Sequence, residues 1–350
     1  MRETEVIDKI QNRFLGVLRN IPFLELVQPL MQISLKGGSP DLLFEAKTKD
    51  RSLKIVVEAK SVGEPRQIRY AIQQLREYLT LMKDAYGVVA APYISNDTAR
   101  LCRENGMGYI DLAGNCFLGF DQIYVELKNY PNLTIEKRQL RSLFTPKSSR
   151  ILRVMLANPR RSWMVKDLAK EAKVSIGLVF KVKERLLDLE FASEDNRSIL
   201  LNRPTELLDK WADSYSFRRN KTYDYFSFDE PKMIEQRLAE YCQPRQIPYA
   251  LTLFSGAALV APFVRYTRGF AYVGRKIPEV VKAVDLKEVS SGPNFTILEP
   301  YDDGIFYGSR NIDGLDVVCD VQLYLDLVGY RGRGEESAQF LLEQRIKSQW

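Results

Sequence analysis

The sequence predicts a multidomain protein of the α/β plus α+β class, with a mixed sheet flanked by helices at its N-terminal end. A length of 350 residues corresponds to two or three domains. Strand-type and helix-type segments alternate over residues 1–130, which favours a sheet covered by helices. A mainly helical stretch follows, and then a region with many aromatic residues and glycine or proline turns. We therefore expect domains at 1–130, 148–215 and 222–350, with a linker at 131–147.

The first domain is expected to begin with an amphipathic helix. Apolar residues recur at steps of three and four from Val6 to Ile21, just before Pro22. Two β-type runs follow at 42–46 and 53–59, separated by a charged turn at 47–51. The remaining expected elements are a helix at 65–83, a strand at 87–91, a short helix at 98–104 and apolar segments at 109–112 and 123–127.

Residues 148–215 are expected to form three helices and a hairpin. The linker before them contains two prolines and the basic cluster Lys137, Arg138 and Arg141. Ser175 is a natural N-cap for the third helix. The expected helices lie at 150–156, 164–172 and 175–187, and the hairpin strands at 191–193 and 198–201 enclose a turn at 196–197. The region from about 222 onward is expected to be α+β and to end in a helix at 335–347.

Composition restricts the chemistry that this chain can perform. The sequence contains no histidine, which excludes serine–histidine and cysteine–histidine nucleophile pairs, histidine bases and most transition-metal sites. Carboxylates, lysine, tyrosine and an oxygen-bound cation such as Mg²⁺ remain. The four cysteines have no paired spacing, so we expect reduced thiols. Without a 20-residue apolar run or a signal-peptide core, the protein is expected to be cytoplasmic and to have no membrane contact.

Asp41 and the segment Glu58-Ala59-Lys60 form a candidate site for phosphodiester hydrolysis. Asp41 follows Pro40 at the start of one expected strand, and Glu58 and Lys60 end the next. Alternation along a strand places Glu58 and Lys60 on one face and Ala59 on the other. Two carboxylates can bind one cation, which lowers the pKa of a bound water and neutralises charge on the phosphate.

These residues resemble the motif of the PD-(D/E)xK nucleases, which have the restriction-endonuclease-like fold. Gln74 and Tyr78, on the following helix, resemble the Gln-x-x-x-Tyr element of the RecB-like branch of that family. The resemblance implies that Asp41, Glu58 and the Ala59 carbonyl hold Mg²⁺ and that Lys60 orients the nucleophile. It also implies that Gln74 and Tyr78, one helical turn apart, face a common groove.

Three points about this motif stay open. The family often adds a glutamate from the opening helix, and either Glu3 or Glu5 fits that role. Glutamate and lysine are also common on exposed strand faces, and Pro-Asp is a frequent turn. Finally, a nuclease-like domain can be kept as an inactive DNA-binding scaffold, because fold does not imply function.

Positive charge is concentrated between residues 137 and 190, where 14 lysines and arginines face only five acidic residues. The whole chain carries +6, so this segment alone accounts for the excess of positive charge. Such a concentration is typical of a segment that neutralises DNA phosphates. A basic helical bundle that docks an acidic protein is the alternative.

The helices and hairpin resemble the winged helix-turn-helix of transcription regulators. Val179, Val182, Leu186 and Leu189 form the inward stripe of the third helix, which leaves Ile176, Gly177, Phe180, Lys181 and Lys183 available on the outside. The resemblance places the third helix in the major groove. The residues expected to read base edges are Ser175, Gly177 and Lys181, and those expected to contact phosphates are Arg160, Arg161 and Arg197.

Three short segments resemble the AbiEi group of type IV toxin–antitoxin antitoxins. They are residues 301–308, residues 321–327 with 332–336, and residues 108–115. In that group a winged helix represses its own operon, and the toxin is a nucleotidyltransferase that the antitoxin opposes without stable binding. Within 108–115 we expect a structural turn after a strand, at which Gly114 and Asn115 tolerate left-handed backbone, and no ligand role for Asp111.

The sequence thus favours a DNA-binding transcriptional regulator of the AbiEi type that carries a nuclease-like N-terminal domain. The expected partners are double-stranded DNA, a nucleotidyltransferase toxin as a functional counterpart, and a second copy of the chain. The main alternative is a Mg²⁺-dependent DNA endonuclease of a phage-defence or restriction system. An interaction scaffold whose basic segment binds protein is the third reading.

Overall fold

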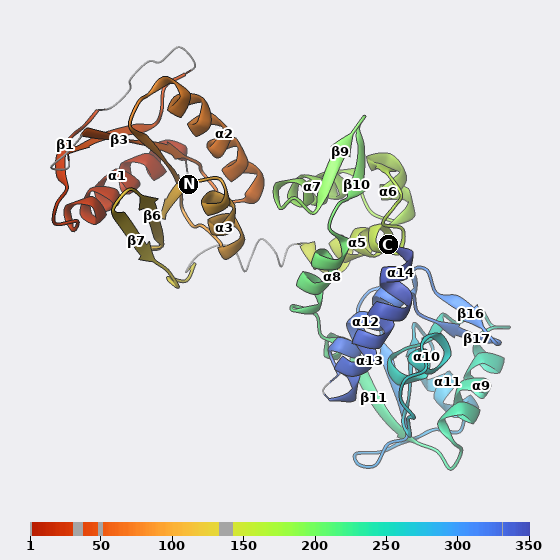
Figure 1. The fold of residues 1–350 in the computed structure, drawn as a ribbon. Coiled ribbons are helices and arrows are strands. Elements are labelled where there is room, and N and C mark those ends of the chain that lie inside the picture. The colour runs from red at the N-terminus through yellow and green to blue at the C-terminus, as the bar shows by residue number, and fades with distance from the viewer. Residues whose placement is uncertain (1, 31–37, 48–51, 133–142, 331) are drawn as a thin grey trace. The chain divides into compact units, whose positions relative to one another are not determined.

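The computed structural model describes residues 2–30, 38–47, 52–132, 143–330 and 332–350. The chain divides into two compact units, one made of residues 1–137 with 188–190 and the other of 138–187 with 191–350 (Figure 1). Each unit is described by itself. The basic cluster of the expected linker and most of the expected turn at 47–51 lie outside the described residues. The boundary expected between 215 and 222 falls within the second unit.

The first unit contains a seven-stranded mixed sheet, as the alternating pattern predicted. Its strands follow one another in sequence order, with β3–β4 and β4–β5 parallel and every other pair antiparallel. Strands β1 and β6 were not predicted from the sequence. The strands are β1 Glu25–Leu30, β2 Leu42–Lys47, β3 Ser52–Ala59, β4 Ala85–Ala91, β5 Gly108–Asp111, β6 Cys116–Phe120 and β7 Ile123–Leu127.

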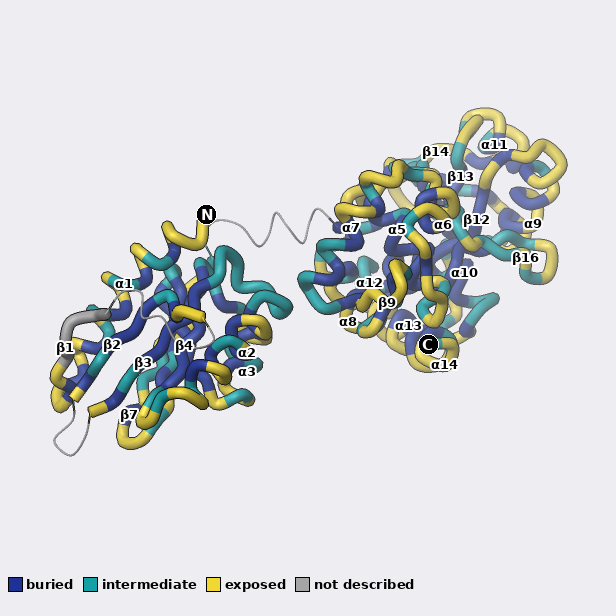
Figure 2. The backbone as a smooth tube through the Cα atoms, turned by 90° about the horizontal axis from the view of Figure 1, so that it is seen from above, coloured by how far each residue is buried: buried dark blue, intermediate teal, exposed yellow. Residues whose placement is uncertain are grey.

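Helices cover both faces of this sheet. Helix α1 (Glu3–Arg19) packs on one face, and α2 (Pro65–Leu81) and α3 (Asn96–Glu104) pack on the other. Because side chains alternate along a strand, Val57 of β3 packs with α1 whereas Val56 packs with α2. The buried stretches of the tube in Figure 2 follow these central strands. The same alternation places Glu58 on the α2 face.

The second unit begins with three helices and a small sheet, in the order that the sequence predicted. A strand before the second helix joins the hairpin, which gives a three-stranded sheet in the order β8-β10-β9. Asn196 and Arg197 have φ values of 46° and 65°, so both adopt the left-handed backbone that favours a tight hairpin turn. The elements are α5 Pro146–Ala157, β8 Trp163–Met164, α6 Val165–Glu171, α7 Ile176–Asp188, β9 Ala192–Asp195 and β10 Ser198–Leu201.

The rest of the second unit is α+β, as expected. Its sheet has the order β14-β11-β15-β13-β12-β17-β16. Helix α8, after the hairpin, was not predicted. None of the described helices is long and apolar enough to cross a membrane. The elements are α8 Pro204–Ala212, η1 Phe217–Arg219, β11 Lys221–Phe226, α9 Pro231–Cys242, β12 Tyr249–Leu251, α10 Leu253–Val260, β13 Gly269–Val273, α11 Ile277–Ala283, β14 Lys287–Glu288, β15 Phe295–Glu299, η2 Asp303–Phe306, β16 Arg310–Ile312, β17 Leu315–Val317, α12 Asp320–Val328, α13 Arg333–Leu341, η3 Leu342–Ile346 and α14 Lys347–Gln349.

Asp326 lies at the centre of a buried polar network in this unit. Its side chain is 0% exposed and accepts hydrogen bonds from Thr252 (2.5 Å), Tyr215 (2.6 Å), Gln322 (2.9 Å) and Tyr272 (3.0 Å). Burial raises the pKa of Asp326, and the four hydrogen bonds act in the opposite direction. The Gln322 amide also donates to the Tyr215 hydroxyl at 2.8 Å, which directs the hydroxyl proton toward Asp326.

Arg153 ties helix α5 to this network. Its guanidinium is 1% exposed, donates to the Gln322 amide oxygen at 2.7 Å, and lies 5.2 Å from the Trp211 ring. One turn earlier, Arg150 makes a two-pronged contact with Asp302 at 2.7 and 2.9 Å. Helix α5 is therefore fastened to the C-terminal part of the unit by charged side chains as well as by apolar packing.

Candidate functional site

The motif residues of the first unit meet where β2 begins and β3 ends. Leu42 lies opposite Val57 in the antiparallel ladder, so the preceding residue, Asp41, lies beside the end of β3. There one Asp41 carboxylate oxygen accepts a hydrogen bond from the Ala59 backbone N–H at 2.7 Å. Strand register thus brings together two parts of the motif that are eighteen residues apart.

Lys60 contacts side chains from strand β3 and from helices α1 and α2. Its ammonium group lies 2.8 Å from a Glu58 carboxylate oxygen and 2.8 Å from the Gln74 side-chain oxygen of α2. It also lies 3.6 Å from the carboxylate of Glu3, on α1. Of the two glutamates considered for the opening helix, the structure brings Glu3 to the site. The sequence carried no signal that distinguished Glu3 from Glu5.

Glu58 is buried, and only one of its two carboxylate oxygens accepts a hydrogen bond. It is 4% exposed, and its second carboxylate oxygen, Oε2, has no hydrogen-bond partner within the described structure. Burial raises the pKa of Glu58 to about 7; the charges of Asp41 and Glu3 add to this rise, whereas the Lys60 hydrogen bond opposes it. Burial also raises the pKa of Asp41, despite its backbone hydrogen bond to Ala59.

This arrangement is compatible with a bound cation. A buried carboxylate oxygen without a partner is costly, and a hard cation would satisfy it. Asp41 and Glu58 are the residues that could supply the charge for such a cation. Within the described residues, however, no group of three or more acidic or cysteine side chains has the spacing of a metal centre.

Tyr78 is buried next to the motif residues. Its side chain is 3% exposed and packs in the core beneath α2, although it lies one turn from Gln74. A Cβ added to Gly38 would lie 3.1 Å from the Tyr78 hydroxyl, so the chain passes directly over it. Tyr78 nevertheless lies beside the motif residues, because burial and the charges of Glu58 and Asp41 raise the pKa of its hydroxyl and a hydrogen bond with Gln74 opposes this rise. The role expected for Gln74 and Tyr78 as a pair at this site stays a prediction. Gln74 remains at the site through Lys60.

Helix α7 in the second unit presents the expected outer face. The Ser175 hydroxyl accepts a hydrogen bond from the Leu178 N–H at 3.3 Å, so the predicted N-cap is present. Ser175, Gly177 and Lys181 are exposed, and a Cβ at Gly177 would meet no atom within 4 Å. Val179, Val182 and Leu186 are buried, which confirms these members of the inward stripe, whereas Leu189 follows the end of α7 and is only partly buried.

Lys183 does not lie on that outer face, which corrects the sequence analysis. It follows Val179 by one turn, so it sits at the inward flank of the helix and is 7% exposed. Its ammonium group lies 2.5 Å from the Glu194 carboxylate of β9. Lys183 therefore fastens the helix to the hairpin. Together with Arg150 and Arg153, it shows that the charge count of 137–190 overstates the charge available to an external partner.

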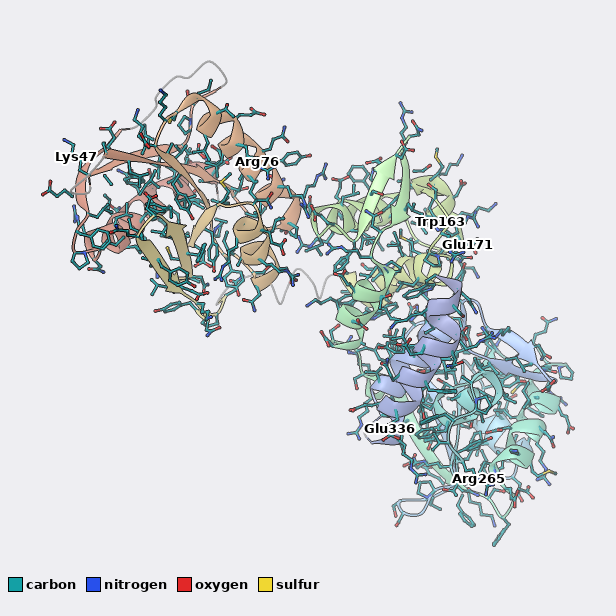
Figure 3. All side chains as sticks on the ribbon, in the orientation of Figure 1. Lys47, Arg76, Trp163, Glu171, Arg265 and Glu336 are labelled. Carbon is teal, nitrogen blue, oxygen red and sulfur yellow. The ribbon has the colours of Figure 1, made fainter. Side chains whose placement is uncertain are left out.

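The three arginines expected to contact phosphates are all exposed. Arg160 donates to the backbone oxygen of Trp350 at 2.7 Å, and Arg161 lies over the Trp163 ring at 3.7 Å. Figure 3 labels Trp163 on strand β8, just before α6, and Glu171 at the end of α6. Arg197 occupies the tip of the hairpin, where its backbone conformation keeps the turn tight.

Asp111 is a structural residue, as expected. It is 0% exposed and accepts hydrogen bonds from the backbone N–H groups of Gly114 (2.7 Å), Asn115 (2.8 Å) and Ile94 (3.0 Å). Gly114 has φ of 125°, whereas Asn115 is not left-handed. Asn115 exchanges two hydrogen bonds of 3.0 Å with the Tyr130 backbone, so this turn also anchors the end of the described first unit.

Residues 200–347 match the model of a family described as "Transcriptional regulator, AbiEi antitoxin, Type IV TA system". The C-terminal part of the chain is therefore similar to the domain of this regulator family. The match covers less than half of the chain. It includes the segments 301–308 and 321–336, so the resemblance expected there is confirmed, and it does not reach 108–115. No curated protein matches the chain.

Three solved structures show a distant likeness to part of the chain. The EndoMS complex with double-stranded DNA is 18% identical, with a TM-score of 0.22, over 29% of this chain and 44% of that one. A repair endonuclease from Pyrococcus abyssi is 14% identical (TM-score 0.21, 29% and 46%), and EndoMS in its apo form is 18% identical (TM-score 0.20, 32% and 46%). The chain thus spans less than half the length of these proteins. At these TM-scores the likeness does not establish a shared fold.

The segment 301–308 holds the C-terminal part of the unit against α5 and α6. Gly304 leaves room for Arg150, since a Cβ there would lie 2.6 Å from the Arg150 side chain. Tyr307 donates from its hydroxyl to the Glu171 carboxylate at 2.9 Å. The sequence analysis recognised this segment only as a family motif, because its partners lie about 130 to 150 residues earlier in the chain.

Proposed function

We propose that this protein is a DNA-binding transcriptional regulator of the AbiEi antitoxin type, which recognises operator DNA through a winged helix formed by α5–α7 and the β8-β10-β9 sheet. The family match over residues 200–347 supports the regulator class. The nucleotidyltransferase toxin and the second copy of the chain expected from the resemblance are part of the proposal. A cytoplasmic location agrees with it, because operator DNA is there.

The observation that carries the proposal is the exposed first part of α7 beside a hairpin with an arginine at its tip. A recognition helix enters the major groove with exposed residues in its N-terminal part, which contact the base edges. Ser175, Gly177 and Lys181 meet this requirement, and Gly177 leaves open space for close approach. Arg197 on the hairpin is placed to contact a phosphate.

A Lys181→Ala variant is expected to lose discrimination between operator and unrelated DNA. An Arg197→Ala variant is expected to bind all duplexes more weakly and to reduce the slope of log Kd against log salt by about one. Fluorescence anisotropy over a salt series with the full chain measures both effects. Lys232→Ala, on α9, is the control for a lost surface charge. If both variants bind like the unsubstituted protein, α7 and the hairpin are not the DNA-reading elements.

A second candidate function is Mg²⁺-dependent cleavage of DNA by the first unit, with a restriction-endonuclease-like fold as the proposed architecture. The unpartnered Oε2 of buried Glu58 favours it. Asp41 and Glu58 would hold the cation, which when bound supplies charge neutralisation and an acidified water. Lys60, held between Glu58 and Gln74, would orient the attacking water, and Gln74 would fix the Lys60 ammonium.

Supercoiled plasmid incubated with the protein and Mg²⁺ tests this candidate. Nicking by the unsubstituted chain that falls at least a hundredfold in Asp41→Ala, as expected for loss of a cation ligand, would support cleavage. Asp97→Ala, an exposed aspartate on α3, is the matched control. Absence of nicking in every sample, with DNA binding intact, would leave the first unit without nuclease activity and the regulator proposal unaffected.

A further inference from the structure

Two large apolar side chains stand on the exposed face of α7. Ile176 is 57% exposed and Phe180 is 53% exposed. They are four residues apart, so they lie one above the other on the helix surface. The Lys183 ammonium lies 5.5 Å from the centre of the Phe180 ring and so makes a cation–π contact with it. About half of the Phe180 side chain nevertheless remains exposed to water. The stabilising stripe of this helix is elsewhere, on Val179 and Leu186.

The surroundings of this apolar pair fit DNA better than protein. Ser175, Gly177 and Lys181 share the exposed face with it, and Lys173 is exposed in the preceding turn. A stable protein interface buries about 800 Å² on each partner and contains few lysines. Two apolar side chains surrounded by lysines offer too little apolar area and too much positive charge for such an interface. In the major groove, by contrast, apolar side chains contact the C5-methyl group of thymine while nearby lysines face acceptors and phosphates.

We propose that Ile176 and Phe180 read thymine methyl groups, so that the preferred operator carries thymines at the positions facing the first two turns of α7. This inference rests on the proposed winged helix and adds the class of sequence that it recognises. Lys181 would then select orientation by hydrogen bonding, and the apolar pair would select thymine by contact.

Replacing thymine with deoxyuridine tests the inference, because it removes the methyl group and keeps the base-pair hydrogen bonds. A 30-base-pair duplex is first selected from a random pool by the full chain and is then synthesised with thymine or with deoxyuridine throughout. The deoxyuridine duplex is expected to bind about fourfold more weakly for each contacted methyl group. In Phe180→Ala the ratio of the two Kd values is expected to fall, and in the Ile176→Ala/Phe180→Ala double variant it should approach one.

Phe228→Ala is the matched control, because Phe228 is 90% exposed and lies in the C-terminal part of the chain. Its thymine-to-deoxyuridine ratio should equal that of the unsubstituted protein. Equal binding of both duplexes by the unsubstituted protein would overturn the thymine inference and leave the winged-helix proposal standing. If the double variant keeps the unsubstituted protein's ratio of the two Kd values, the assignment to Ile176 and Phe180 is overturned. The same holds if the double variant changes its oligomeric state and keeps that ratio, because the two side chains would then serve a protein interface. Failure to enrich any duplex at low salt would overturn the winged-helix proposal and the inference with it.

Discussion

An Asp326→Ala variant is expected to lose about 3–5 kcal/mol of unfolding free energy, the loss typical of breaking a buried charged network. The substitution removes the acceptor of four hydrogen bonds in a site with no access to water. Each buried donor left without a partner costs about 1–3 kcal/mol. The variant also removes the acceptor that orients the Gln322 amide, whose oxygen accepts the hydrogen bond of the buried Arg153 guanidinium.

Urea unfolding followed by tryptophan fluorescence measures this loss, since Trp211 packs against Arg153. Asp303→Ala, an exposed aspartate of the same unit, should change the unfolding free energy by less than about 0.5 kcal/mol. Asp326→Asn keeps an oxygen acceptor and should fall between the two, so that a measurable folded variant remains even if Asp326→Ala does not fold. An Asp326→Ala midpoint equal to that of Asp303→Ala would contradict the role assigned to the network.

A Glu58→Gln variant is expected to be more stable than the unsubstituted protein at pH 8 by about 3 kcal/mol, and to be equal to it near pH 4. The pKa of Glu58 is raised from 4.5 to about 7 in the folded protein, chiefly by burial. The unfolded chain therefore loses this proton first as pH rises. Between pH 4.5 and 7 the folded state binds more protons than the unfolded state, so the unfolding free energy falls with rising pH. Glutamine keeps the acceptor for Lys60 and has no charge to bury.

Unfolding free energies of both proteins between pH 4 and pH 8, measured in EDTA, test this expectation. The difference should grow across the window from pH 4.5 to 7 and then stay constant. Glu77→Gln, an exposed glutamate on α2, should show no such growth. A Glu58→Gln variant that is less stable at pH 8 would indicate that Glu58 is held ionised by contacts stronger than its burial.

Most of the local structure follows from residue patterns. Helix α1 is defined by its three- and four-residue apolar repeat, and α7 by the Ser175 cap and its inward stripe. The strands around Asp41 and Glu58 were also predicted, because their β-type runs and the turn between them are continuous in sequence. Strands β1 and β6 were missed, since Pro29 in β1 and Gly119 in β6 weaken the strand pattern that their neighbours in the sheet restore.

The candidate site shows where residue patterns stop. The sequence grouped Glu58, Lys60, Gln74 and Tyr78, which lie together in the structure, but it did not predict that the Tyr78 side chain is buried. Periodicity places Gln74 and Tyr78 on neighbouring positions of one helix face, and only the angle of α2 on the sheet decides that one side chain is buried. In the same way, the sequence predicts that Lys183 is free to contact DNA, whereas in the structure its ammonium group donates a hydrogen bond to Glu194.

By itself, the sequence determined the chemistry open to this protein. The absence of histidine, the Pro-Asp and Glu-x-Lys spacing and the basic middle segment are properties of composition and order along the chain. Only the tertiary structure decided which charges are already engaged: Arg153 in the core, Lys183 against the hairpin and Glu58 half satisfied beneath α2. The reason is physical, because the free energy of a charge depends on the water and partners around it, and these are brought together from distant parts of the chain only when it folds.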